Sequence, residues 1–414
     1  MASTSSATHL RSQDHSELAS AGANTGPLTV LIVVPTLQAG AADAGAVELV
    51  RILSSAGHQP LVVSSGGRMA EDVAAAGGEC IWLDVASSNP AIMLRNAFAL
   101  VRLVRGRKCH IVHAHGRAAA WSACLAARIA GVPFLTTWYK GFREQNLFKR
   151  LYNGVMARGD RVIAVSDQIA ELINDRYGTP WERIAVVPAS IDFERFDPST
   201  VSRARIDAVR RCWGAGRGDR VILVVGRMLR RKGHHLVVQA VLRLRAMGIR
   251  DFVCVFAGQD QTTRYASELW DQVQAADATD IIRLTGPVED LPAAYAAATV
   301  TVSAAVQPEG LQRALIEAQA MARPVIVSDL GAGSDVVLAP PAVPEDRMTG
   351  LRFPTGDDRA LAATLIRLFS LSEGEQQAIG TRGRDWVLSH FNAPVVAELT
   401  LKLYAEVAVA RKSA

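Results

Sequence analysis

Short apolar runs alternate with amphipathic segments along almost the whole chain after residue 27. Runs such as residues 29–34, 221–225 and 252–257 are nearly free of polar side chains, which is typical of strands buried on both faces of a parallel sheet. Between the runs, segments such as 118–130 and 233–245 carry apolar residues at helical spacing. This alternation of strands and helices predicts a doubly wound α/β fold.

The alternation occurs twice, and a charged, turn-rich segment separates the two copies. We predict a first Rossmann-like domain over residues 28–195, a linker over 196–218, and a second Rossmann-like domain over 219–383. For residues 384–414 we predict helices that pack back towards the first domain. Residues 1–27 are polar and rich in Ser, Thr, Ala and Gly, which predicts a disordered tail. Because ligands of such sheets bind beyond the carboxyl ends of strands, we expect the two domains to face a ligand-binding cleft.

Composition narrows the class of protein. The 414 residues carry a formal net charge of +5, and no dense Lys/Arg tract or recognised motif indicates nucleic-acid binding. The five cysteines are far apart and lack zinc-ligand spacing, so we expect reduced thiols in a cytoplasmic protein. No apolar run approaches the roughly 20 residues of a membrane span. The first 26 residues lack the apolar core of a secretion signal, so we do not expect them to act as one.

Two carboxylates dominate the segment 307–329. Glu309 follows a proline in a turn, and Glu317 lies about two turns into an Ala-rich helical segment that Pro324 ends. Carboxylates accept charge-assisted hydrogen bonds from sugar hydroxyls, so this pair predicts a grip on a polyhydroxylated ligand. Two glutamates eight positions apart also occur by chance.

A second candidate is the turn after the apolar run 221–225. Gly226-Arg227 ends the predicted strand, and Lys232-Gly233 opens the next helix. A buried strand that runs into a glycine-containing basic turn and then a helix is a common phosphate site of α/β folds. The alternative is that Arg227 and Lys232 are solvated cations beside Arg230 and Arg231.

These two motifs resemble those of the retaining family 4 glycosyltransferases, which have the GT-B fold. The matching residues are Gly226-Arg227…Lys232-Gly233 and Pro308-Glu309…Glu317-Ala318. Residues 150–166 and 184–196 are similar to bacterial lipopolysaccharide-type members, and the resemblance covers nearly the whole chain after residue 27.

The resemblance implies transfer of a hexose-type sugar from a UDP or GDP sugar to a glycan or lipid-linked acceptor in the synthesis of cell-envelope polysaccharide or lipopolysaccharide. In that family pattern Arg227 and Lys232 hold the diphosphate, Glu317 accepts from the ribose hydroxyls, and Glu309 contacts the sugar near the reacting carbon. We expect Glu309, Arg227 and Lys232 to be the catalytic residues. The implied donor site consists of Gly40, Gly226, Arg227, Lys232, Glu309, Gly310, Leu311 and Glu317.

The same chemistry predicts no metal and no cofactor besides the nucleotide-sugar co-substrate. Breaking a sugar–phosphate bond leaves charge on the diphosphate, which fixed cations and helix N-termini stabilise. The sequence contains no Asp-x-Asp triplet. We therefore expect Arg227 and Lys232 to replace a metal.

The first domain holds the candidate acceptor-side residues. His113 and His115 flank a predicted strand end in the tract VHAHGR, which also contains Arg117, and Tyr139 stands where the family has a histidine. Any of these four residues is a candidate contact to the acceptor or to phosphate. The alternative for the histidines is ordinary packing in the domain core.

Two stretches of the first domain are both basic and apolar, residues 95–108 and 138–150. Such faces bind anionic lipid headgroups, which would place the protein peripherally on the inner face of the plasma membrane. An ordinary amphipathic helix with a solvated basic side is an equally good interpretation.

Several motif positions depart from the family pattern. Ala41 stands in a loop where the family has a second glycine, and its side chain restricts the backbone there. The departures keep open a degenerate glycosyltransferase-like protein that binds nucleotide or glycan with little or no turnover. They are Gly40-Ala41-Ala42-Asp43 for Gly-Gly-x-Glu, Tyr139 for histidine, Leu311-Gln312 for Phe-Gly, Gly331-Ala332-Gly333-Ser334-Asp335 for Gly-Gly-x-x-Glu, and Thr299 for aspartate.

Overall fold

The computed structural model describes residues 26–38, 40–141, 146–259, 263–307, 309–331 and 333–410. The chain divides into two compact units. Unit 1 comprises Met1–Ala189 and Pro394–Ala414, and unit 2 comprises Ser190–Ala393.

Unit 1 is built on a parallel sheet. Among the described residues it has seven strands in the order β3-β2-β1-β4-β5-β6-β7, and every pair of neighbours is parallel. The order reverses between β1 and β4, as it does in doubly wound folds that bind nucleotides. The strands are β1 (Thr29–Val33), β2 (Gln59–Ser64), β3 (Glu79–Trp82), β4 (Ile111–Ala114), β5 (Phe134–Trp138), β6 (Arg161–Ala164) and β7 (Ile184–Val186).

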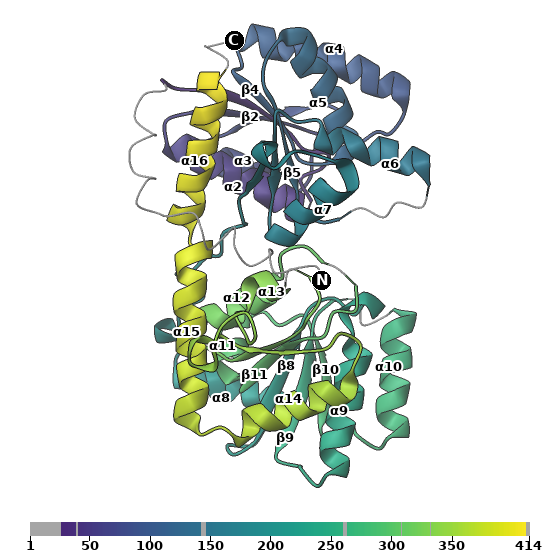
Figure 1. Cartoon of the computed structure of the whole chain (residues 1–414), viewed down its shortest axis with the longest axis vertical. Helices are drawn as coiled ribbons and strands as arrows, with labels where there is room; N and C mark the ends of the chain where they lie inside the picture. Colours follow the sequence, from purple (N-terminus) through teal and green to yellow (C-terminus); the bar gives the residue numbers. More distant parts are fainter. Residues whose placement is uncertain are drawn as a thin grey trace. The chain divides into compact units, whose positions relative to one another are not determined.

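Helices and short turns connect these strands, and helices cover both faces of the sheet (Figure 1). The last helix joins this unit from far along the chain: Leu403, Tyr404 and Val407 are buried in the same core cluster as β1 and the first helix. The elements are α2 (Ala41–Ser55), α3 (Ala70–Ala75), α4 (Pro90–Gly106), α5 (Arg117–Ala130), α6 (Leu147–Asn153), η2 (Gly154–Ala157), α7 (Asp167–Tyr177), η3 (Trp181–Arg183) and α16 (Ala393–Ala410).

Unit 2 repeats this topology. Its described strands form a parallel sheet in the order β10-β9-β8-β11-β12-β13. They are β8 (Arg220–Val225), β9 (Phe252–Ala257), β10 (Ile282–Gly286), β11 (Val300–Ser303), β12 (Val325–Ser328) and β13 (Leu351–Phe353).

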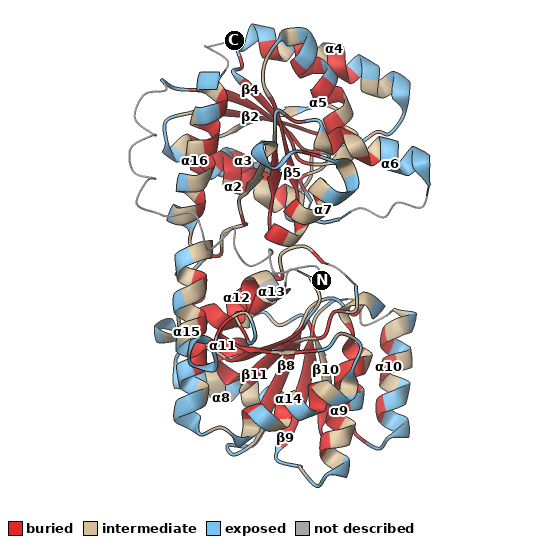
Figure 2. Ribbon diagram, viewed as in Figure 1, coloured by how far each residue is buried: buried red, intermediate tan, exposed pale blue. Residues whose placement is uncertain are grey.

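Alternating residues of β8 pack into two separate hydrophobic cores, one on each face of the sheet. Ile222 and Val224 pack with α9, α10 and α14, whereas Val221 and Leu223 pack with α11, α12 and the end of α15. Figure 2 shows the strands buried and the outer sides of the helices exposed. The elements are η4 (Pro198–Thr200), α8 (Arg203–Cys212), η5 (Arg230–Lys232), α9 (His234–Ala246), α10 (Arg264–Ala275), α11 (Leu291–Ala297), α12 (Arg313–Ala320), α13 (Gly333–Val336), η6 (Glu345–Arg347), α14 (Asp358–Ser370) and α15 (Glu373–Phe391).

The two sheets confirm the predicted fold class of two doubly wound Rossmann-like domains. The runs 29–34, 221–225 and 252–257 are strands because their side chains are buried on both faces. Across the described residues, no helix is long and apolar enough to cross a bilayer.

The structure corrects the predicted linker at 196–218. Phe196 and Trp213 are buried in a core of unit 2, and α8 between them packs against α11. Arg205 of α8 donates to both carboxylate oxygens of Asp290, at 2.7 and 2.8 Å. The segment belongs to unit 2 because its apolar side chains complete that core.

Candidate functional site

The turn after β8 requires glycine at two points. Gly226 has φ 146°, a conformation that residues with a side chain rarely adopt. A Cβ on Gly258, which follows β9, would lie only 1.8 Å from the Gly226 carbonyl oxygen. These glycines let the ends of β8 and β9 approach closely, so that the following turn lies at the carboxyl edge of the sheet.

Gly233 joins this turn to the loop after β11. It has φ 69°, and a Cβ there would lie 1.7 Å from the carbonyl oxygen of Ala304. The amide of Val306 donates to the Arg231 carbonyl at 2.9 Å. The backbone therefore holds η5 directly against the chain that leads to Glu309.

Glu309 pairs with two cations of this turn. Lys232 Nζ lies 2.6 Å from Glu309 Oε2, and Arg231 Nη1 forms an ion pair with Glu309 Oε1. The Glu309 side chain is only 6% exposed, so both carboxylate oxygens are neutralised in a mostly buried place. Of the predicted residues, the structure brings Lys232 and Glu309 together, while Arg227 is exposed. Sequence analysis did not single out Arg231.

Glu317 has different partners. It lies on α12, where the buried Tyr295 hydroxyl of α11 donates to Oε2 at 2.9 Å and Arg313 lies 3.6 Å from Oε1. Burial raises the pKa of Glu317, although Arg313, the Tyr295 hydroxyl and Arg195 oppose that effect. Glu317 is therefore a nearly buried acceptor whose hydroxyl partner the sequence analysis missed.

The residues between the two glutamates differ from the prediction. Helix α12 begins at Arg313, so Glu317 lies about one turn into the helix instead of two, and Gly310 and Leu311 precede it. Leu311 packs against a core cluster of unit 2. Gln312 is buried and accepts a hydrogen bond from Ser303 Oγ at 2.5 Å, which ties the start of α12 to β11.

Thr299 keeps one property of the aspartate that it replaces in the family pattern. Its hydroxyl oxygen accepts the backbone N–H of Val221 at 3.0 Å. The residue directly before β11 is thereby held against β8 by a neutral acceptor. This departure leaves the strand pairing beneath the site intact.

In unit 1, Gly40 is engaged by a neighbouring side chain. The amides of Gly40 and Gln38 donate to Asp43 Oδ2 at 2.9 and 3.0 Å, and Thr36 Oγ1 lies 3.5 Å from the same oxygen. Asp43 is buried and lies in the first turn of α2, where a carboxylate is favoured by the helix dipole. The amides of Gln38 and Gly40 thus already have a carboxylate acceptor within unit 1.

His113 is part of a buried network. Its Nδ1 lies 2.5 Å from the hydroxyl of Tyr404 on α16, and its Nε2 lies 2.8 Å from Thr137 Oγ1 on β5. Burial lowers the pKa of His113 well below its usual value, and the neighbouring His115 adds to the effect. The surroundings of His113 are those of the alternative interpretation, ordinary packing in the domain core.

His115 and Tyr139 form a second pair beside it. The Tyr139 hydroxyl lies 2.8 Å from His115 Nδ1, and a Cβ on Gly45 of α2 would lie 2.1 Å from that hydroxyl. Burial lowers the pKa of His115 to about 4, against the opposing effects of the Ala42 carbonyl and Asp43. Burial also raises the pKa of Tyr139. Both groups are neutral near pH 7.

Arg117 lies at the start of α5, where its Nη1 donates to Asn153 Oδ1 at 2.9 Å. Within the described ranges, no group of three or more His, Cys, Asp or Glu side chains is placed to hold a metal ion. The charges at the carboxyl edge of the unit 2 sheet include those of the basic turn and of Glu309 and Glu317.

Two family models match the chain, one to each half. The model for Glycosyltransferase Family 4 matches residues 43–195, and the model for Glycosyl transferases group 1 matches residues 219–370.

A relative and two solved structures extend this match. A D-inositol 3-phosphate glycosyltransferase from Kineococcus radiotolerans is 30% identical over 263 residues, which is 60% of this chain and 58% of that protein. The chain thus spans less than two thirds of that relative's length. A glycosyltransferase from Rickettsia africae superposes with a TM-score of 0.83 at 26% identity, over 92% of this chain and 99% of that one. Anabaena HepE, solved in complex with UDP, superposes with a TM-score of 0.77 at 16% identity, over 92% of this chain and 100% of that one. Together with the two parallel sheets and the charged turn, these matches show that the chain belongs to the family 4 glycosyltransferases with the GT-B fold.

Proposed function

We propose that the protein transfers a hexose-type sugar, with retention of anomeric configuration, from a UDP or GDP sugar to a glycan or lipid-linked acceptor of the cell envelope. The observation that carries the proposal is Glu309, buried between Lys232 and Arg231 at the carboxyl edge of the unit 2 sheet. A carboxylate paired with two cations of the neighbouring turn offers an acceptor for sugar hydroxyls beside donors for phosphate oxygens.

The departing diphosphate gains negative charge when the sugar–phosphate bond breaks. In our proposal Lys232 and Arg227 stabilise that charge in place of a metal, and Glu309 accepts from the transferred sugar. Glu317 accepts from the ribose hydroxyls, and the Tyr295 hydroxyl fixes its orientation. The UDP in the HepE structure supports a uridine nucleotide as the first donor to test.

A donor screen tests this function. Purified protein is titrated with UDP, GDP, UDP-glucose and GDP-mannose by calorimetry, and bound sugars are then incubated with candidate acceptors or with water alone. We expect one nucleotide to bind and its sugar to be released or transferred, with the anomeric configuration of the product read by NMR. Binding of none of the four ligands would contradict the proposal for these donors.

The alternative is a nucleotide-binding protein with little or no turnover. One departure that keeps this alternative open is the unit 1 loop, in which Asp43 already accepts the amide protons of Gln38 and Gly40. Nucleotide binding without sugar release or transfer, at high protein concentration over hours, would support this alternative. An Asp43→Asn variant with stronger activity would show that the carboxylate restrains the enzyme.

A membrane-bound acceptor is supported by two helices of unit 1. On α6, Leu147 and Phe148 are 80% and 84% exposed and lie beside Lys149 and Arg150. Figure 2 shows this helix exposed. On α4, Leu94 and Phe98 are half exposed, and Arg95, Arg102 and Arg105 are exposed as well. Apolar side chains beside cations are the combination that binds anionic lipid surfaces.

Co-sedimentation with vesicles tests the membrane surface. We expect binding to phosphatidylglycerol-containing vesicles to fall at least tenfold in the double variant Leu147→Ser/Phe148→Ser. Trp82→Ser is the matched control, because Trp82 is 72% exposed on β3, outside both helices. Vesicle binding that does not depend on anionic lipid, or that is unchanged in the double variant, would contradict this part of the proposal.

A further inference from the structure

The three consecutive cations of η5 all pair with carboxylates, but not with the same one. Arg230 forms an ion pair with Glu268 of α10 and lies over the Tyr265 ring, 5.1 Å from its centroid. Arg231 and Lys232 instead take the two oxygens of Glu309. The turn is therefore a built arrangement of directed charges and not a solvated basic run.

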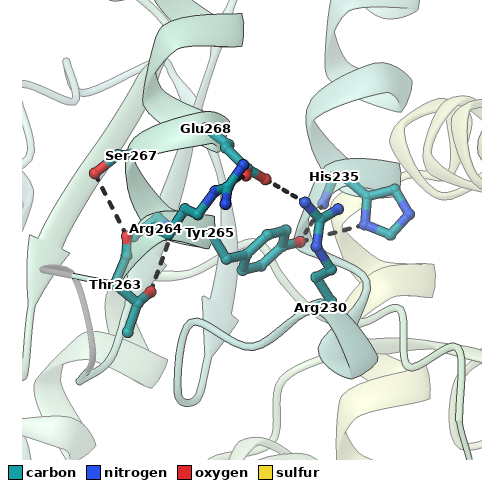
Figure 3. Close-up of polar contacts among 8 residues, drawn as sticks. Arg230, His235, Thr263, Arg264, Tyr265, Ser267 and Glu268 are labelled. Carbon is teal, nitrogen blue, oxygen red and sulfur yellow. Dashed lines mark hydrogen bonds and ion pairs between the residues drawn. The ribbon is translucent and has the colours of Figure 1, made fainter.

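Figure 3 shows Arg230 beside Glu268 and Tyr265 of α10. Glu268 also pairs with Arg264 at 3.0 Å, and the Tyr265 hydroxyl accepts the backbone N–H of His235 at 3.2 Å. These contacts fix the outer side of η5 to the start of α10. The turn then presents Arg231 and Lys232 towards the loop after β11, where Val306 is hydrogen-bonded to the Arg231 carbonyl.

A donor diphosphate cannot use both of these cations without a cost. Glu309 is nearly buried, and a buried carboxylate that loses its counter-charges is strongly disfavoured. If Lys232 moves to the diphosphate, Glu309 keeps a counter-charge only through Arg231. The Oε2 atom that Lys232 releases then becomes available to accept from a sugar hydroxyl.

We propose that Arg231 is a positioning residue: it holds Glu309 through Oε1 while Lys232 serves the diphosphate, and so sets the preference for a sugar nucleotide over the bare nucleotide. This role rests on the proposed function. The two adjacent residues then have different roles. Lys232 binds the nucleotide part of the donor, and Arg231 acts on the sugar part through Glu309.

A double-mutant cycle tests this role. Dissociation constants for UDP, UDP-glucose, GDP and GDP-mannose are measured by calorimetry, and the ratio of the nucleotide constant to the sugar-nucleotide constant is the readout. We expect Arg231→Met and Glu309→Gln each to lower this ratio roughly tenfold, and the double variant to lower it no further, because residues that act as one unit are not additive. Arg231→Lys should restore part of the ratio.

Two neighbouring variants separate the possible causes. Lys232→Met should weaken UDP itself at least tenfold. Arg230→Met removes the same charge one position away and should leave the ratio unchanged. Thermal unfolding of every variant checks that the fold is retained.

The outcomes are distinct. If Arg231→Met lowers the ratio equally in the wild-type and Glu309→Gln backgrounds, or weakens UDP and UDP-glucose alike, the positioning role is overturned and the proposed function stands. If the wild type binds none of the four ligands, the proposed function fails for these donors and the role of Arg231 fails with it.

Discussion

The charged turn of unit 2 and the histidine–tyrosine network of unit 1 were both expected to contact ligand, and they differ in physical character. In unit 2, Arg231, Lys232 and Glu309 carry full charges, and the two cations are 39% and 26% exposed. In unit 1, His113 and His115 are buried and neutral, and their partners are hydroxyls. Ion pairs at an exposed edge can be exchanged for a charged ligand, whereas neutral buried hydrogen bonds mainly hold elements together.

The two regions therefore respond to different perturbations. Changing the charged side chains of the turn should affect ligand binding, whereas disturbing the backbone of the turn should affect stability. Changing residues of the buried network should affect stability more than ligand binding. The following substitutions are arranged from the largest expected effect to the smallest.

Gly233→Ala attacks the backbone beneath the charged turn. The left-handed conformation costs an alanine about 1–2 kcal/mol, and the Cβ would overlap the Ala304 carbonyl, so we expect unit 2 to lose about 4 kcal/mol of stability. Gly248→Ala is the control, because Gly248 also has positive φ but nothing lies within 4 Å of its Cβ position. Urea unfolding should show a loss of only about 1 kcal/mol there. Equal losses of stability in both variants would mean that Gly233 does not pack closely against the loop after β11.

Acid should weaken the buried network. The folded-state pKa of His115 is about 4 and lies below its unfolded value of 6.5, so the unfolded chain binds a proton that the folded chain refuses between these pH values. Stability contributed by the neutral histidine is present above pH 6.5 and falls as pH falls. Between pH 7 and pH 5 this amounts to roughly 2 kcal/mol. Hydrogen exchange of β4, corrected for intrinsic rates, should show that loss in wild type and a smaller one in His115→Gln. An identical pH dependence in both proteins would place the titrating group elsewhere.

Glu317→Gln separates binding from stability within unit 2. Burial raises the pKa of this carboxyl group, so the folded state disfavours its charge above the unfolded pKa, and the amide removes that penalty at pH 7. We expect stability to be unchanged or slightly higher, while the nucleotide dissociation constant rises about tenfold through the loss of a charged acceptor. Calorimetry and urea unfolding measure the two effects. Glu345→Gln, which alters an exposed pair with Arg367, should change neither; weaker stability in Glu317→Gln would show that the carboxylate is structural.

The sequence predicted the strands of both units well because strands buried on both faces need apolar side chains at every position. Residues 252–257 form a strand with the predicted bounds. Strand β13 was missed because three residues, Leu351–Phe353, are too few to show a pattern.

Two helices were missed or shortened for a different reason. Helix α15 runs from Glu373 to Phe391, but only its end was predicted, since glycines inside it weaken the helical pattern. A Cβ on Gly380 would lie 2.1 Å from the Ala322 carbonyl, so that glycine permits close packing after α12. Helix α8 was not predicted because half of its side chains are charged and none is fully buried.

The candidate site shows more clearly what could not be predicted from the sequence alone. The motif residues Lys232 and Glu309 were identified from the sequence and do meet in space. Which of the cations Arg227, Arg230 and Arg231 accompanies Lys232 could not be deduced, because that depends on the direction in which η5 leaves β8. The burial of His113 likewise depends on α16, which lies about 290 residues further along the chain.

Single hydroxyl deletions give the smallest and most specific test of the buried network. Tyr139→Phe removes the partner of His115 Nδ1, and Tyr404→Phe removes the partner of His113 Nδ1. Each leaves an imidazole nitrogen without its hydrogen bond, which costs roughly 1 kcal/mol. Tyr404 is fully buried and Tyr139 is only partly so, and water can replace a lost partner only where it has access; Tyr404→Phe should therefore cost more. Both variants should bind nucleotide as the wild type does. If Tyr139→Phe keeps full stability in urea but loses sugar transfer, Tyr139 contacts the substrate, and the distinction between a binding region in unit 2 and a structural network in unit 1 fails at that residue.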